Sequence, residues 1–455
     1  MYDYIIVGAG SAGCVLASRL SEDPQTSVLL LEAGGPDEAQ EIHIPVAFSK
    51  LFQSPLDWNY TTEEEPNLKN RKLYWPRGKV LGGSGSINAM IYIRGNHYDY
   101  DHWQELGNQG WSYTDVLPYF KKAENQERGE SEYHGTGGPL NVTDRVKNNP
   151  LSHAFIEAGK EMSLPENPDF SGESQDGVGV YQVTQRQGRR HSAAVAYLHP
   201  ALGRPNLTVL TQAHATRVLF EGKRAVGVAY IKDGQPQEIR ANKEVILSGG
   251  TVNSPQLLLL SGVGPASTLK ALGIDVIADL PGVGENLQDH PFVSVCFSSN
   301  QPISLANAES VENFQEYMTS QTGPLASNIA EVGGFVKTRP ELPEPDLQFH
   351  FAPIYYINHG FTMPEGHGFT IGPTLVTPKS RGSVKLHSND PMQHPAITGN
   401  YLADPEDLRV MIEGIKLCRQ LADTRAFAEL RDQEILPGSQ VQSDADLESY
   451  IRENL

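Results

Sequence analysis

The chain has 455 residues, of which 39% are hydrophobic, and it carries a formal net charge of −19 at pH 7. This length is enough to bury a large core in two or more lobes, and the negative charge argues against nucleic acid or an anionic membrane as a partner, because both would repel the protein. No stretch is apolar for long enough to cross a bilayer, so we expect no signal peptide, no membrane span and a cytoplasmic location.

The three cysteines, Cys14, Cys296 and Cys418, are few and widely spaced. This pattern fits a reducing compartment and predicts no metal cluster. We expect all three to be small buried side chains and we expect no metal site.

Residues 2–20 predict a buried strand, a tight glycine-rich turn and a helix. Gly8, Gly10 and Gly13 have the G-x-G-x-x-G spacing, in which the glycines allow the turn, the approach of a pyrophosphate and close helix packing. The next strand, "SVLLLEAG", carries Glu32, whose carboxylate can accept hydrogen bonds from both ribose hydroxyls and would repel a 2′-phosphate. The motif therefore predicts FAD or NAD, and we include the flanking Ser11 and Ala33 in the cofactor site.

Residues 76–101, "PRGKVLGGSGSINAMIYIRGNHYDYD", bear on the choice between these two cofactors. Five of the eight residues from Gly78 to Gly85 are Gly or Ser, which lets backbone approach a flat or charged ligand and offers free N–H groups. A nicotinamide enzyme does not need this second element, whereas a flavin needs both its pyrophosphate and its ring system held. The run favours FAD, although composition alone also fits an ordinary loop.

Two long segments carry a family resemblance: "GKVLGGSGSINAMIYIRGNHYDYD", residues 78–101, and "GTVNSPQLLLLSGVG", residues 250–264. Both resemble signatures of the glucose-methanol-choline (GMC) flavin oxidoreductases. Shorter pieces agree with them, namely "DWNYTTEEEP", "RRHSAAVAYLHPAL" and "PGVGENLQDHP". The resemblance runs from Tyr2 to Leu455 and is strongest to the bacterial alcohol and choline dehydrogenase branch.

The resemblance implies a set of cofactor contacts. Gly8, Gly10, Gly13 and Glu32 match the adenosine and pyrophosphate site. The segment beside the flavin ring is implied to contain Val80, Gly82, Gly83, Asn88, Ala89, Met90 and Ile91. Val218 is implied to make a backbone contact to the adenine. Ile87 stands where some members carry a histidine joined covalently to the flavin, so we expect non-covalent FAD, and Gly85 replaces the usual serine.

We expect an α/β fold (α+β overall) in which a Rossmann-like FAD-binding domain is interleaved with a substrate-binding lobe built on an antiparallel sheet. The first takes residues 1–150 and 188–291, with strands at 207–211, 215–221 and 244–250. The second takes residues 151–187 and 292–395, where 345–353 and 368–388 alternate apolar and polar side chains. Residues 396–455, with an amphipathic helix at 406–423, are implied to begin the C-terminal region of the family.

The catalytic base stays unassigned. Alcohol oxidation by a flavin needs a group that takes the hydroxyl proton, and the family resemblance places a histidine for this in an "H-P-x-G-T" segment. His199 and His394 precede prolines but lack the following Gly-Thr. Residues 443–455 predict a helix that starts after Ser443, and in the family the histidine follows this helix. We therefore expect the base beyond Leu455, in a truncated C-terminal region.

Other polar residues are candidates for the substrate pocket. His350 matches a histidine that lines the pocket in choline-oxidising members of the family, although a lone histidine on a strand is also often structural. Glu331 is a candidate for the same cavity, although most glutamates face solvent. Asp289 and His290 are expected to form hydrogen bonds to the cofactor domain.

We expect an FAD-dependent oxidoreductase that oxidises the CH–OH group of a small or medium alcohol, choline-like or aliphatic, by hydride transfer to flavin N5. The alternatives are a GMC protein with diverted chemistry, such as a fatty-acid photodecarboxylase, and an FAD-binding protein without turnover because its catalytic segment is absent. A plain NAD dehydrogenase is a more distant alternative. The sequence identifies neither the alcohol nor the electron acceptor.

Overall fold

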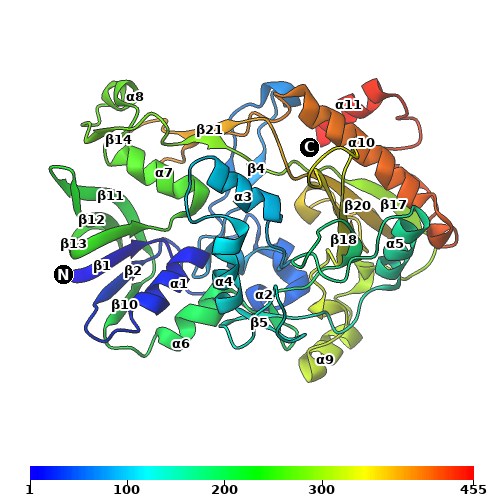
Figure 1. Cartoon of the computed structure of the whole chain (residues 1–455), viewed down its shortest axis with the longest axis horizontal. Helices are drawn as coiled ribbons and strands as arrows, with labels where there is room; N and C mark the ends of the chain where they lie inside the picture. The colour runs from blue at the N-terminus through cyan, green and yellow to red at the C-terminus, as the bar shows by residue number, and fades with distance from the viewer.

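The computed structural model describes residues 1–455, and two large sheets lie side by side in it (Figure 1). The sheet nearer the N-terminus has the strand order β10-β2-β1-β13-β12-β11. Its strands in chain order are β1 (Tyr2–Val7), β2 (Val28–Leu31), β10 (Leu207–Leu210), β11 (Ala213–Glu221), β12 (Arg224–Lys232) and β13 (Gln235–Leu247). β10, β2, β1 and β13 are parallel, and β12 and β11 extend them as an antiparallel pair. This mixed α/β sheet confirms the Rossmann-like fold.

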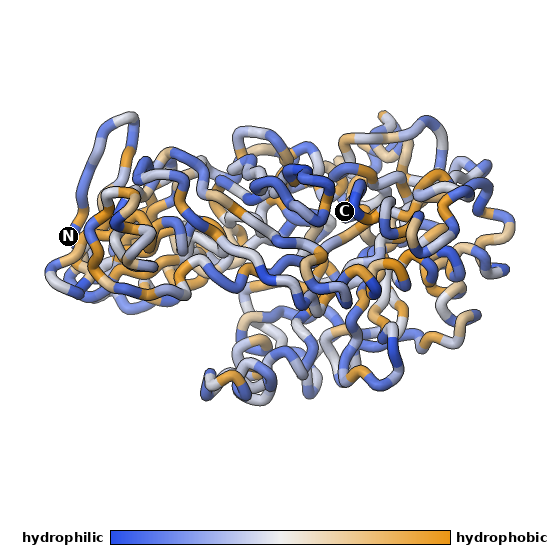
Figure 2. Tube along the Cα trace, turned by 90° about the horizontal axis from the view of Figure 1, so that it is seen from above, coloured by the Kyte–Doolittle hydropathy of each residue, from blue (hydrophilic) through white to orange (hydrophobic).

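Burial explains the central strands of this sheet. All four residues of β2 are buried, as expected for a parallel strand covered on both faces. Helix α1 (Ser11–Leu20) covers one face, where Cys14 and Ala17 pack against Ile6 and Leu30. Helix α7 (Gly250–Leu260) lies over the opposite side (Figure 1). Figure 2 shows the hydrophobic segments running through the interior of this lobe.

The second sheet is antiparallel throughout, with the order β23-β17-β20-β19-β18-β7. Its strands in chain order are β7 (Gly177–Val180), β17 (Val295–Ser299), β18 (Val332–Val336), β19 (Leu347–Ala352), β20 (His367–Leu375) and β23 (Glu434–Leu436). In β19 the side chains of Leu347, Phe349 and Phe351 enter the main hydrophobic core. Because side chains alternate along a strand, Gln348 and His350 lie on the opposite face.

Helices from distant parts of the chain cover the core face of this sheet. They are α5 (Pro150–Glu161), α10 (Pro405–Ala422) and α11 (Asp444–Asn454). The α11 helix begins as the sequence predicts, because the Ser443 hydroxyl accepts a hydrogen bond from the Asp446 N–H in a capping box. Residues 396–455 thus complete the core of the substrate lobe.

The division between the lobes differs in detail from the expected boundaries. Tyr60, Leu68 and Trp75 belong to the stretch assigned to the cofactor domain, yet their side chains pack in the core of the second lobe. Strand β12 was not predicted. Residues 382–385 form β21 in a separate three-stranded sheet rather than a strand of the main antiparallel sheet.

Short elements complete the fold. The remaining strands are β3 (Tyr60–Thr61), β4 (Tyr74–Trp75), β5 (Glu124–Gln126), β6 (Leu140–Val142), β8 (Gln185–Arg186), β9 (Arg189–Arg190), β14 (Val263–Gly264), β15 (Ala278–Asp279), β16 (Glu285–Leu287), β21 (Gly382–Lys385) and β22 (Ala396–Thr398). The remaining α-helices are α2 (Gln40–His43), α3 (His97–Glu105), α4 (Tyr113–Ala123), α6 (His199–Ala201), α8 (Ala266–Ala271) and α9 (Val311–Ser320). The three cysteines are free and buried. None of the helices combines the length and the apolar character needed to span a membrane.

Candidate cofactor and substrate site

A cavity of about 470 Å³ opens where β1, β2 and β13 end. Parallel strands place ligands at this edge, outside their carboxyl ends. Gly8, Gly10 and Ser11 line the cavity from the β1–α1 turn. Gly8 has φ +97°, and a Cβ there would lie 2.6 Å from the carbonyl oxygen of Ser248. The turn therefore needs glycine at this position, and it leaves the first N–H groups of α1 free for an anionic group.

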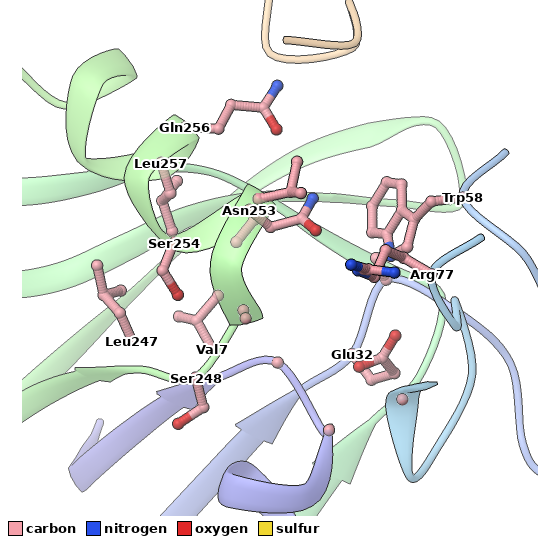
Figure 3. Close-up of a pocket in the computed structure, with 18 of the residues that line it drawn as sticks. Val7, Glu32, Trp58, Arg77, Leu247, Ser248, Asn253, Ser254, Gln256 and Leu257 are labelled. Atoms are coloured by element: carbon pink, nitrogen blue, oxygen red, sulfur yellow. The ribbon is translucent and has the colours of Figure 1, made fainter. Parts of the chain in front are cut away.

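Glu32 lies at the end of β2 on the wall of this cavity (Figure 3). Its Oε2 accepts a hydrogen bond from the Ala9 N–H at 2.8 Å, and its Oε1 accepts one from the Gly34 N–H at 2.8 Å. Burial raises the pKa of this carboxyl, although these two N–H groups act in the opposite direction. Each oxygen keeps a lone pair for a ligand hydroxyl, so the ribose role predicted for Glu32 is compatible with its position.

The second glycine-rich segment packs directly on the first. The Gly82 N–H donates to the Ala9 carbonyl at 2.7 Å, and a Cβ on Gly83 would lie 2.7 Å from the Cα of Gly10. Gly83, Ser84 and Gly85 line the cavity opposite α1. Two backbone segments without bulky side chains thus face the same space, which suits a pyrophosphate.

Several polar and aromatic wall residues were not singled out from the sequence. Trp58 and Arg77 lie on one side of the cavity, and Asn253 approaches from α7 (Figure 3). The Trp58 ring meets the His214 ring edge-on at 5.6 Å between centroids. Trp58 and Asn253 occur in "DWNY" and "TVNSPQ", which carried the family resemblance but gave no role to either side chain. The fit of the cavity to a dinucleotide thus depends on aromatic and amide groups as well as on glycines.

Several predicted cofactor residues do not line this cavity. They are Gly13, Val80, Gly82, Asn88, Ala89, Met90, Ile91 and Val218. Gly13 acts by packing, because a Cβ there would lie 1.9 Å from the carbonyl oxygen of Gly8. Val80 is fully buried in a cluster with Ile87.

Val218 lies away from the wall of this cavity. Its side chain is buried against the sheet, and its N–H donates to the Ser261 hydroxyl at 2.8 Å, so this donor is already satisfied. The residues of β11 that line the cavity are Ala213, His214 and Ala215. A backbone contact from this strand would therefore come from the start of β11.

Residues 88–91 leave the cofactor cavity and cross to the second lobe. Asn88 is exposed, and its Oδ1 accepts a hydrogen bond from the Met90 N–H at 3.0 Å. Ile91 packs against a buried cluster that contains Tyr181. The segment therefore joins the glycine-rich turn to the face of the antiparallel sheet that carries His350.

His350 is surrounded by aromatic rings. The centroid of its ring lies 6.0 Å from that of Tyr181 and 6.4 Å from that of Phe292, and Phe292 lies 6.3 Å from Tyr356. Burial lowers the pKa of His350 to about 4, so its imidazole is neutral at physiological pH. A neutral imidazole can accept a hydrogen bond from an alcohol hydroxyl.

Glu331 lines a different cavity, of about 270 Å³, together with Arg145, and His350 is not in its wall. Its carboxylate forms an ion pair with Arg145 at 2.7 Å and accepts hydrogen bonds from the Asn149 N–H, the Ser152 hydroxyl and the Ser327 hydroxyl, each at 2.7 Å. Each carboxylate oxygen of Glu331 thus accepts two hydrogen bonds. Glu331 therefore stabilises the start of α5, a role that the sequence around it does not indicate.

The remaining polar candidates are engaged within the fold. Asp289 accepts a hydrogen bond from the Tyr401 hydroxyl, which belongs to the second lobe rather than to the cofactor domain. The Nε2 of His199 lies 2.9 Å from an oxygen of Asp37. The His394 ring packs edge-on against Tyr60 at 4.8 Å between centroids.

The GMC oxidoreductase model matches this chain in two parts, its N-terminal domain at residues 2–292 and its C-terminal domain at residues 378–455. An alcohol dehydrogenase [acceptor] of Pseudomonas putida is 48% identical over 99% of this chain and 84% of that protein. The mitochondrial choline dehydrogenase of Mus musculus is 46% identical over 99% of this chain and 78% of that protein.

Solved structures of oxidases superpose on the whole of this chain. A pyridoxine 4-oxidase superposes over 100% of this chain and 86% of its own, with a TM-score of 0.91 and 30% identity. A point variant of the formate oxidase of Aspergillus oryzae, solved to examine FAD modification, superposes with a TM-score of 0.93 and 28% identity over the same shares.

Proposed function

Because the chain belongs to the GMC oxidoreductase family, an FAD-dependent family that acts on CH–OH donors, we propose that it oxidises a small or medium alcohol without a fixed charge. The observation that carries this proposal is the cavity between the two glycine-rich turns, with Glu32 at the end of β2. When bound there, FAD supplies the hydride acceptor. The free N–H groups of α1 would hold its pyrophosphate, and Glu32 would accept from its ribose.

We assign the substrate to the space beside His350, across residues 88–91 from the cofactor. A pKa of about 4 makes His350 a weak base, so its role is to accept the hydroxyl hydrogen bond and orient the alcohol. The ring of Phe292 would lie beside the carbon chain.

The absence of a free carboxylate beside His350 favours an uncharged alcohol. Glu331, the carboxylate that the sequence offered as a pocket candidate, is paired with Arg145. A choline-like substrate is the second candidate, because aromatic faces also stabilise a quaternary ammonium, and Phe292 and Tyr356 supply such faces.

Anaerobic reduction of the bound flavin tests the proposal. We expect primary alcohols of four to eight carbons to bleach the flavin absorbance in the dark, and choline at equal concentration to do so more slowly. Faster reduction by choline would favour a choline-like substrate over an uncharged alcohol. Reduction by no alcohol would overturn the proposal, and decarboxylation of a fatty acid only under blue light would replace it with the photochemical alternative.

Replacing His350 tests its assignment. His350→Gln keeps a hydrogen-bond acceptor and His350→Leu removes it, so we expect KM for the alcohol to rise by about tenfold in the Leu variant, the scale of one hydrogen bond, and by less in the Gln variant. His153→Gln on the exposed face of α5 is the matched control. Equal KM values for all three variants would remove His350 from the substrate site.

A further inference from the structure

Arg190, in β9, is buried without a counter-ion. Its side chain is 2% exposed. Nε donates to the Ile42 carbonyl oxygen at 2.7 Å, and Nη1 donates to the Gly85 carbonyl oxygen at 3.1 Å and to Asn88 Oδ1 at 2.9 Å. The remaining nitrogen, Nη2, is buried and has no hydrogen-bond partner in the protein. The three oxygens that accept hydrogen bonds from the Arg190 side chain are all uncharged.

The other two buried arginines are neutralised. Arg94 pairs with Glu124 at 3.0 Å, and Arg145 pairs with Glu331 at 2.7 Å. Burial lowers the pKa of Arg190 to about 9, and no neighbouring acid opposes this effect. Arg190 is therefore still protonated at neutral pH, and its charge is not compensated by the chain. A buried charge without a partner is costly, so its position calls for an explanation.

The contacts of Arg190 lead to the cofactor site. Gly85 lines the cavity, and Asn88 lies in the segment that we place beside the flavin. Asn88 Oδ1 accepts hydrogen bonds from both Arg190 and the Met90 N–H. Both bonds are made to the oxygen, so the Asn88 amide is held with its NH₂ group directed away from Arg190. One guanidinium thus fixes the backbone and the amide of the proposed flavin segment.

We infer that Arg190 is a positioning residue for the flavin, which holds the Asn88 amide in place and supplies a fixed positive charge that favours the reduced cofactor. This inference rests on the proposed placement of the flavin beside residues 88–91. Reduction by a hydride adds one negative charge to the cofactor, so a nearby positive charge stabilises the reduced state more than the oxidised one. Across about 10 Å, at an effective dielectric constant of about 20, one unit charge shifts the equilibrium between oxidised and reduced flavin by about tenfold or more.

The midpoint potential of the bound flavin, measured at equilibrium with a reference dye, tests this charge. Arg190→Met should lower the potential by about 30 mV or more, which is tenfold for a two-electron couple, and Arg190→Lys should stay close to the wild type. Asn88→Asp has nearly the same shape and places a carboxylate against Arg190, so it should lower the potential without opening a cavity. Arg189→Met removes the same charge from an exposed neighbour and should have no effect, because solvent screens it.

The outcomes separate the inference from the proposed function. The inference is overturned if Arg190→Met and Asn88→Asp bind FAD with the wild-type potential, or if Arg190→Lys shifts the potential as far as Arg190→Met does. If Arg190→Met does not fold, Arg190→Gln, which removes the charge and keeps hydrogen-bond donors for the Ile42 and Gly85 carbonyls, takes its place with the same expected shift. A wild-type protein that binds FAD but is reduced by no alcohol would overturn the proposed function and leave this potential measurement intact.

Discussion

Glu32 serves the fold and the cofactor at the same time. Its two oxygens accept the N–H groups of Ala9 and Gly34 in a buried position, so Glu32→Ala leaves two donors without a partner. We expect this variant to lose about 2 to 4 kcal/mol of unfolding free energy, as well as affinity for FAD. Urea denaturation of the apoprotein and titration with FAD measure the two effects separately.

A control and a conservative change sharpen this prediction. Glu41→Ala, on the exposed side of α2, should change neither quantity. Glu32→Gln keeps one acceptor oxygen and should fall between the wild type and Glu32→Ala. A Glu32→Ala apoprotein as stable as the wild type would show that the two backbone hydrogen bonds contribute little.

Ile87 is the reason to expect a flavin without a covalent bond to the chain. It is 2% exposed in a cluster with Ile42, Leu51 and Val80, and a hydrocarbon side chain offers no nucleophile. We expect acid precipitation to release all the flavin into the supernatant. Flavin fluorescence that migrates with the denatured protein on a gel would contradict the prediction, and denaturation in guanidinium without acid is the control for trapped flavin.

The sequence predicts local features of the site better than long-range ones. Gly8, Gly10 and Glu32 lie where their spacing indicates, because a turn and the strand after it are determined by nearby residues. The role of Glu331 could not be predicted, because its partner Arg145 is distant in the sequence. The pattern of β11 does not show which of its residues reach the cavity, and in the structure these are Ala213, His214 and Ala215 rather than Val218.

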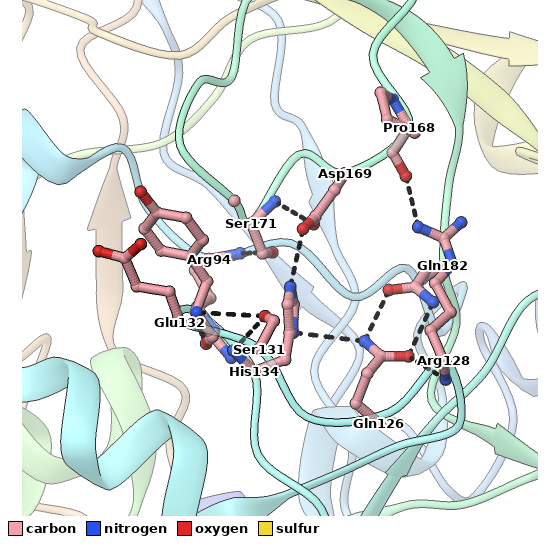
Figure 4. A network of polar contacts seen from close by, with 12 residues as sticks. Arg94, Gln126, Arg128, Ser131, Glu132, His134, Pro168, Asp169, Ser171 and Gln182 are labelled. Atoms are coloured by element: carbon pink, nitrogen blue, oxygen red, sulfur yellow. Dashed lines mark hydrogen bonds and ion pairs between the residues drawn. The ribbon is translucent and has the colours of Figure 1, made fainter.

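At the scale of elements, a buried polar network joins the β5–β6 region to the loop before β7 (Figure 4). His134 Nδ1 lies 3.0 Å from Glu124, and its Nε2 lies 2.9 Å from Asp169. Glu124 also pairs with Arg94 at 3.0 Å. Nothing in the sequence around His134 indicates this network, because its members come from four separate segments.

The network predicts a pH-dependent stability. Burial lowers the pKa of His134, but hydrogen bonds to Asp169 and Glu124 outweigh this effect and raise it to about 9. Its folded pKa exceeds the unfolded value of about 6.5, so its contribution is complete below about pH 6.5 and is lost as the pH rises towards 9. The contribution is up to about 3 kcal/mol at low pH.

Urea denaturation of His134→Gln across this pH range is the measurement. The variant should be less stable than the wild type at pH 6, and the difference should shrink by pH 9.5. His102→Gln, on the exposed side of α3, is the control and should show a small difference at every pH. A difference for His134→Gln that does not depend on pH would mean that the imidazole is neutral in the folded protein.

At the scale of the molecule, the cofactor cavity gathers segments from most of the first lobe. Its wall includes residues from the β1–α1 turn, β2, the second glycine-rich turn, β11, α7 and the loop at Pro391. A ligand that binds only the folded chain stabilises it, by about 2.7 kcal/mol at a concentration of 100 times Kd. We expect FAD to raise the melting temperature of the apoprotein in a dose-dependent manner.

Matched nucleotides test whether the whole cavity is used. NAD shares the adenosine and pyrophosphate with FAD but lacks the flavin, and NADP adds a 2′-phosphate that Glu32 would repel. We expect NAD to raise the melting temperature by less than FAD does, and NADP to leave it unchanged. Equal shifts with FAD and NADP would contradict the arrangement of Glu32 in the cavity.

The parallel sheet also sets the order in which the protein can assemble during synthesis. β1 pairs with β2 on one side, but its other edge pairs with β13, where Val7 lies opposite Leu247. A ribosome that adds about 5 to 20 residues per second needs about ten to fifty seconds to synthesise the chain between β1 and β13. The unpaired N–H and C=O groups along this edge of β1 stay open to other nascent chains for this time, so we expect the yield of folded protein to depend strongly on chaperones and on the rate of translation.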